Sequence, residues 1–138
     1  MSRSRRRALA ATAALAPLTL VVVACSGQGS VEAPHVRAAA TAFVRTTSVD
    51  PGSACALLAP VTAREVADDA PCAAGLADAG LPPAGEIRSV QVYGKDAVVH
   101  TSADTLFLAR FDRGWLITAA GCRPQGEDLP YDCDVKGG

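Results

Sequence analysis

This 138-residue sequence lacks the patterns that indicate a metal or phosphate site. It contains no Cys-x-x-Cys pair, and its two histidines, His35 and His100, lie far apart, whereas a structural metal site needs close ligand pairs. No glycine-rich phosphate loop is present, and four of the 12 glycines instead flank the two ends of the mature chain: Gly27, Gly29, Gly137 and Gly138. We therefore expect neither a metal nor another cofactor.

A concentration of basic residues is also missing from most of the chain. Four of the 13 Lys and Arg residues fall within the first seven positions, and all 14 Asp and Glu residues come later. Residues 25–138 therefore carry nine basic and 14 acidic side chains, a net charge of −5. Nucleic-acid binding needs a basic stripe or patch, so we exclude nucleic acid as a partner.

The amino terminus has the layout of an export signal. "MSRSRRR" is followed by the apolar stretch "ALAATAALAPLTLVVVA", which Pro17 interrupts and Ala24 ends. A basic region, a short apolar run and a small final residue predict a signal peptide over residues 1–24. The alternative is a transmembrane anchor, which needs about 20 apolar residues and usually no central proline. "SRRRAL" also resembles a twin-arginine signal, so both export routes stay open.

The residues that end the signal resemble a known processing motif. "VVAC", Val22–Cys25, is similar to the lipobox of bacterial lipoproteins, in which the cysteine thiol takes a diacylglycerol and becomes the first mature residue. The resemblance implies lipidation at Cys25 and a location on the outer face of the cytoplasmic membrane, anchored stably because two acyl chains are buried. The small polar residues that follow predict a flexible tether over residues 25–33.

Four cysteines remain after Cys25, and an even number in an exported chain predicts disulfides. Three pairings are possible. We favour Cys55–Cys72 and Cys122–Cys133, because each pair brackets a short segment that contains turn residues. A loop of about 15 residues closed in this way contributes roughly 3 kcal/mol to stability, which matters in a small domain.

Helical patterns fill the first half of the mature chain. Apolar residues recur at helical spacing over residues 34–47, and Asp50 is placed to cap a short helix that ends at Pro60. Thr62 and Glu65 fit a capping box for a third helix before Pro71. A fourth helix is expected over residues 71–80.

Strand patterns follow Ala84. "EIRSVQVYG", "DAVVHTS", "TLFLARF" and "GWLITAAG" are separated by connections too short for anything but antiparallel hairpins. The prediction is a single α+β domain over residues 34–138, with short helices packed on one face of a four-stranded antiparallel meander. Both faces of "TLFLARF" carry apolar side chains, so part of the second face should also be covered. The loop-rich tail should fold back through a Cys122–Cys133 bond.

Helices containing "ACALLAP" followed by a strand meander resemble the nuclear transport factor 2-like (cystatin-like) superfamily. This resemblance implies a cone-shaped α+β fold. The ending "GWLITAAGCRP…YDCDVKGG" is similar to the tails of uncharacterised actinobacterial lipoproteins, which have no known activity. Neither resemblance implies catalytic residues in this chain.

Candidate catalytic residues are few. "HTSAD" brings His100, Ser102 and Asp104 close in sequence. In an extended strand they would lie on one face about 7 Å apart per step, which is too far for a proton relay. We therefore prefer a solvated strand end followed by a turn. Enzymes of the superfamily that the chain resembles keep an acid or base inside the cone, and His100, Asp104 and Tyr93 are the candidates for that position.

Trp115 and the acidic residues of the tail are two further candidates for a binding role. Trp115 is most simply a core or cross-strand anchor, the alternative being an exposed binding aromatic. The tail carries an acidic cluster that lacks the ligand register of a calcium loop and is better explained as solvated: Glu127, Asp128, Asp132 and Asp134.

The resulting expectation is a non-catalytic binding or accessory module of the cell envelope, whose partner is an envelope protein or a small ligand. The alternative is a small pocket enzyme, a hydrolase or an isomerase. The two differ in one observable feature, because an enzyme needs an ionisable side chain that points into the cone.

Overall fold

The computed structural model describes residues 27–137. The expected signal peptide and Cys25 lie outside this range. The elements are, in chain order, α1 (Gly27–Thr47), α2 (Pro51–Cys55), α3 (Pro60–Ala67), α4 (Cys72–Asp78), β1 (Ile87–Tyr93), β2 (Asp96–Thr101), β3 (Thr105–Phe111), β4 (Gly114–Arg123) and β5 (Asp132–Lys136). No helix within residues 27–137 has the length and apolar character to span a bilayer.

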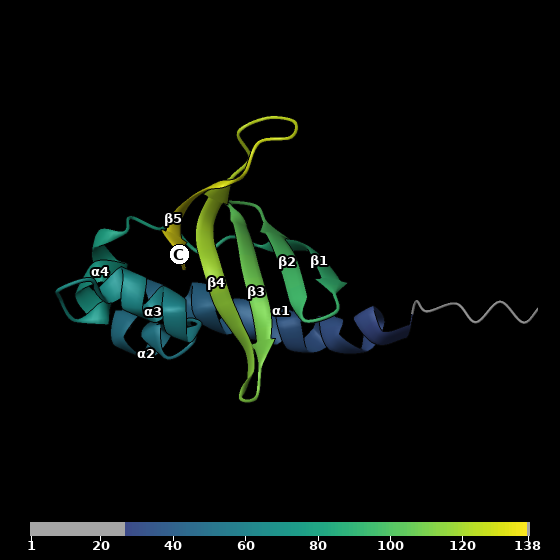
Figure 1. Ribbon diagram of the computed structural model, residues 1–138, viewed down its shortest axis with the longest axis horizontal. Helices are drawn as coiled ribbons and strands as arrows, with labels where there is room; N and C mark the ends of the chain where they lie inside the picture. Colours follow the sequence, from purple (N-terminus) through teal and green to yellow (C-terminus); the bar gives the residue numbers. More distant parts are fainter. Residues whose placement is uncertain (1–26, 138) are drawn as a thin grey trace, which may run out of the picture.

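The strands form one antiparallel sheet in the order β1-β2-β3-β4-β5, with α1 lying across one face (Figure 1). The α+β class and the meander are confirmed, but the expected number of four strands is wrong. The fifth strand comes from the tail: β5 pairs with β4, and Cys133 stands directly opposite Cys122. Tyr131, just before β5, packs edge-on against Phe107 with ring centroids 5.1 Å apart, so the tail covers part of the sheet's second face as expected.

Helix α1 is longer than the sequence indicates. It begins at Gly27, not near Pro34, so most of the flexible tether expected over residues 25–33 is helical. Tertiary contacts explain this difference. Glu32 accepts a hydrogen bond from Trp115 Nε1 at 2.8 Å and pairs with Arg110 at 3.0 Å, so the first turns are held on the sheet despite a poor local propensity.

The core lies between α1 and the sheet. The inner side of α1 contributes Val36, Ala40 and Phe43, spaced by four and three residues as on one helical face. They pack in one cluster with buried side chains of the strands, chiefly Val99, Leu106, Leu108 and Ile117.

The three short helices gather near the carboxyl end of α1. Asp50 caps α2 by accepting from the backbone N–H of Ser53 at 3.1 Å and from the Ser53 hydroxyl, which together lower the pKa of Asp50. The Cys55–Cys72 disulfide joins α2 to α4, and Cys122–Cys133 joins β4 to β5. Both bonds are those favoured from the sequence.

The α2–α3 connection reaches the edge of β4. Leu58 forms an isolated parallel bridge with Ile117, in which Ala59 N donates to Ile117 O at 2.7 Å and Ile117 N donates to Leu57 O at 2.9 Å. The Thr62 hydroxyl then donates to the carbonyl of Thr118 at 3.0 Å. The helical half is therefore tied to the sheet by backbone hydrogen bonds as well as by apolar packing.

Candidate functional site

A cavity of about 370 Å³ lies between the carboxyl half of α1, α4, the connection to β1 and the start of β3. Its walls are mainly apolar, and they include Phe43, Leu76, Leu81, Pro82 and Leu106. Both the volume and the apolar lining are within the usual range of small-molecule sites. Among the described residues that line this cavity, Asp104 has the one charged side chain.

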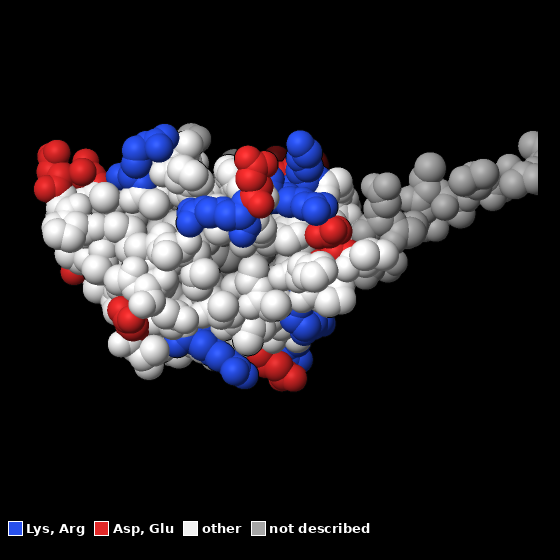
Figure 2. Space-filling model, turned by 90° about the horizontal axis from the view of Figure 1, so that it is seen from below, with Lys and Arg blue, Asp and Glu red and all other residues white. Residues whose placement is uncertain are grey.

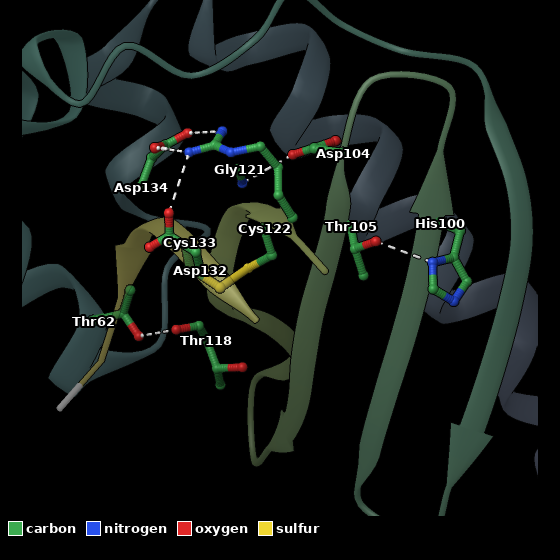
Figure 3. The surroundings of a disulfide bond; sticks show 11 residues. Thr62, His100, Asp104, Thr105, Thr118, Gly121, Cys122, Asp132, Cys133 and Asp134 are labelled. Atoms are coloured by element: carbon green, nitrogen blue, oxygen red, sulfur yellow. Dashed lines mark hydrogen bonds and ion pairs between the residues drawn. A yellow bond between two sulfur atoms is a disulfide. The ribbon is translucent and has the colours of Figure 1, made fainter. Parts of the chain in front are cut away.

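Asp104 is held in place by the framework (Figure 3). Its Oδ1 accepts from the hydroxyl of Thr101 at 2.7 Å, and its Oδ2 accepts from the backbone N–H of Gly121 at 2.9 Å. Gly121 has a φ of +65° at a register shift of β4, so its N–H is turned away from a regular ladder position. Asp104 therefore joins the β2–β3 turn to the irregular part of β4.

A separate charged cluster lies beside Asp104. Arg123 makes two hydrogen bonds to the carboxylate of Asp134, at 2.8 and 3.0 Å, and approaches Asp132 at 3.9 Å. The hydrogen bond to Asp134 and its negative charge raise the pKa of Arg123, and the same contact lowers the pKa of Asp134. Because Arg123 binds the β5 carboxylates, Asp104 has no ion pair within residues 27–137.

The other candidate residues are not gathered around this cavity. His100 bonds Thr105 Oγ1 through Nδ1 at 3.0 Å, and it alternates with the buried Val99, so it lies on the sheet face away from α1. Ser102 instead accepts from the backbone N–H of Glu86. The expectation that a strand end followed by a turn holds His100, Ser102 and Asp104 is confirmed, because β2 ends at Thr101 and the next residues form a turn.

Tyr93 lies at the β1–β2 turn, where 61% of its surface is exposed. Trp115 is only 7% exposed and donates to Glu32, so it is a core and cross-element anchor. In the tail, Asp132 and Asp134 serve the ion pairs with Arg123. Across the part of the chain that the structure describes, no group of three or more metal-ligating side chains is present.

Sequence reasoning identified Asp104 but missed the rest of the cavity. Thr47, Leu81 and the Pro82–Pro83 pair also line it. Two consecutive prolines between a helix and a strand are the one local signal for a stiff, shaped wall at this point. Comparison with protein-family models, with curated proteins and with solved structures finds no match to this chain.

Proposed function

We propose that this chain is a lipid-anchored protein of the outer face of the cytoplasmic membrane that binds a small ligand without chemical change. The observation that carries the location is the tetrapeptide Val22–Cys25 at the end of a basic and then apolar leader. The two disulfides within residues 55–133 support it, because such bonds persist in oxidising compartments outside the cytoplasm.

The cavity supports the binding role. Its apolar walls favour a ligand that is mainly hydrocarbon, and the carboxylate of Asp104 favours a hydrogen-bond donor or an ammonium group at one end. Two framework donors occupy only part of the accepting capacity of a carboxylate, which has about four lone-pair sites. We therefore propose a compact organic amine, or a neutral molecule with a polar donor, as the ligand class.

We also propose that the domain belongs to the cystatin-like cone class and is related to the uncharacterised actinobacterial lipoproteins that its tail resembles. A single helix laid across an antiparallel meander, with a cavity at one end of the helix, supports this proposal.

One observation favours the second candidate, a small pocket enzyme. Asp104 is ionisable and lines the cavity. Both of its oxygens, however, hold framework donors, and the histidine of the same segment lies on the opposite face of the sheet. A binding role requires no partner base, so it accounts for the arrangement more simply.

The location is tested with Cys25→Ser in the native host. The exchange removes the thiol that takes the lipid, so membrane retention and incorporation of labelled fatty acid should both be lost. Cys25→Ala serves as a second variant without a hydroxyl. A Cys25→Ser protein that still sediments with membranes would contradict the proposal.

The binding role is tested by NMR titration of the folded protein with benzylamine, benzoate and toluene. Benzylamine should shift signals of the cavity residues, and benzoate should not, because it meets the Asp104 carboxylate with like charge. Ala77→Trp places a large side chain at the cavity and should abolish the shifts, whereas Ala74→Trp, on the same helix but outside the lining, should not. Equal shifts with benzoate, or binding unaffected by Ala77→Trp, would refute this site.

A further inference from the structure

Helix α1 begins immediately after the lipid attachment point that we propose. Gly27 is the first described residue and already belongs to α1, and it lies two positions after Cys25. Two residues span at most about 7 Å. An acylated Cys25 therefore leaves almost no slack between the bilayer surface and the start of the helix.

The start of α1 is also fixed to the sheet. A side chain added at Gly29 would contact Val92 at 3.4 Å, at the β1–β2 turn, and Glu32 is bonded to Arg110 and Trp115 beside the β3–β4 turn. The first turns of the helix and these two turns consequently form one end of the molecule. We define it as the anchor end: residues 27–37, 93–96 and 110–114.

Apolar side chains are exposed at the anchor end. Val31 is 66% exposed, Tyr93 61% and Phe111 38%, and each belongs to a different one of its three segments. Exposed aliphatic and aromatic side chains on three segments at one end of a molecule offer apolar contacts to an interaction surface. Tyrosine in particular is enriched where proteins meet the headgroup region of a bilayer.

Charge is divided unevenly between the anchor end and the rest of the domain. The anchor end carries four basic and three acidic residues, which gives it a net charge of +1. The remaining described residues include five basic and eleven acidic ones, which gives them a net charge of −6. On the face seen in Figure 2, Lys and Arg side chains lie in the middle and toward the amino-terminal end of α1 with Asp and Glu among them, and Asp and Glu prevail at the far end. A bilayer with anionic headgroups attracts the first end and repels the second.

We infer that the domain docks on the bilayer through the anchor end rather than swinging freely from its lipid. This inference rests on the proposed lipid attachment at Cys25. The occupant of the surface is a bilayer containing anionic lipid, because the anchor point lies two residues away and the charge distribution favours that orientation. Phe43 is 16 residues along α1 from Gly27, so the cavity wall at Phe43 lies about 24 Å along the helix from its start.

The test uses Trp115, the single tryptophan, as a built-in probe of the anchor end. Acylated protein is placed in vesicles of phosphatidylcholine and phosphatidylglycerol, with part of the phosphatidylcholine carrying a nitroxide on its headgroup. Trp115 fluorescence should be strongly quenched. In the matched variant Trp115→Phe/Leu129→Trp, the probe moves to an exposed loop at the opposite end of β4, about 30 Å away, and quenching should be weak. The Arg110–Glu32 ion pair still holds the start of α1 in this variant, and Trp115→Tyr/Leu129→Trp, which keeps a ring with a polar hydrogen at position 115, should give the same weak quenching.

A second pair of variants tests the surface itself. Tyr93→Ser/Lys95→Glu removes an aromatic ring and reverses one charge at the anchor end, which should shift the ratio of docked to undocked protein by about 30-fold or more from the charge change alone. Leu129→Ser/Lys136→Glu makes the same kinds of change at the far end and should leave the quenching of Trp115 unchanged.

The outcomes separate the two proposals. Protein that is not acylated and does not float with the vesicles overturns both the lipid attachment and the docking. Acylated, vesicle-bound protein overturns the docking alone if the native tryptophan and the relocated one are quenched equally, or if Tyr93→Ser/Lys95→Glu has no effect on the quenching.

Discussion

Replacement of Asp104 separates a framework role from a catalytic one. Asp104→Ala deletes the carboxylate acceptor of the Thr101 hydroxyl, which keeps the backbone carbonyl of residue 104 at 3.1 Å, and leaves the buried N–H of Gly121 without its partner. Hydrogen bonds to a charged group contribute roughly 1.5–3 kcal/mol each, and Asp104 is only half-buried, so the expected loss is about 3 kcal/mol. Asp104→Asn keeps an acceptor for Gly121 N, and its loss should be about 1 kcal/mol, since neutral hydrogen bonds are weaker.

The assay is urea unfolding of the oxidised protein followed by Trp115 fluorescence, with the free energy of unfolding taken from midpoint and slope. Asp96→Ala is the matched control, because Asp96 is exposed and should change the free energy by no more than about 0.5 kcal/mol. An Asp104→Ala protein as stable as the wild type, or more stable, would refute the framework role. It would favour the enzyme alternative, because catalytic groups are commonly retained at the expense of stability.

Three further predictions follow from packing, redox state and charge. Gly75→Ala should destabilise the protein by about 3 kcal/mol or prevent folding, because the added Cβ would lie 1.8 Å from the carbonyl oxygen of Val66. Thermal unfolding measures this effect. An unchanged unfolding midpoint would contradict the close approach of α3 and α4. Thiol titration of a Cys25→Ser variant, denatured without reductant, should find no free cysteine; two or more reactive thiols would exclude the disulfide pairs. The hydrogen bond from Arg123 lowers the pKa of Asp134 below the value of about 3.9 expected in the unfolded chain. The ion pair therefore contributes its full stabilisation at pH values above about 3.9. This stabilisation is lost as the pH falls through the folded-state pKa of Asp134. Asp134→Asn should remove this acid-limb component, and an unaltered pH profile would show that the pair does not stabilise the fold.

The sequence predicts well those parts of the fold that rest on local signals. Helical spacing of Val36, Ala40 and Phe43 locates the buried side of α1, and the short polar connections locate the hairpins of the meander. The cysteine spacing gives the disulfide pairs. In each case the deciding interaction lies within a few turns or within one hairpin, so a local pattern is sufficient.

The parts that the sequence does not predict depend on distant contacts. The first turns of α1 are stabilised by Glu32, whose partners lie 78 and 83 positions away. Strand β5 has a charged sequence between a proline-rich loop and the chain end, and it becomes a strand because Cys133 is bonded to Cys122 and Val135 enters the core. The role of Gly75 likewise depends on a neighbouring element, because its missing side chain makes room for the backbone of α3.

The same limit applies to the candidate site. The residue type of Asp104 is enough to mark it as a candidate site residue. The hydrogen bond that it accepts from Gly121 comes from a residue 17 positions later in the chain. That bond depends on a left-handed backbone conformation at Gly121, which no local sequence pattern indicates. The cavity walls come from α1, α4, the segment before β1 and β3, so their assembly is a property of the whole fold.

The Cys122–Cys133 bond has a consequence for how the protein responds to proteolysis. It closes a loop whose tip is exposed, including Leu129, and exposed loop tips are where extracellular proteases cut first. A single cut there would leave Val135 and the last strand covalently attached to the rest of the chain. Nicked molecules would therefore keep their shape, and only electrophoresis after reduction would reveal the missing piece.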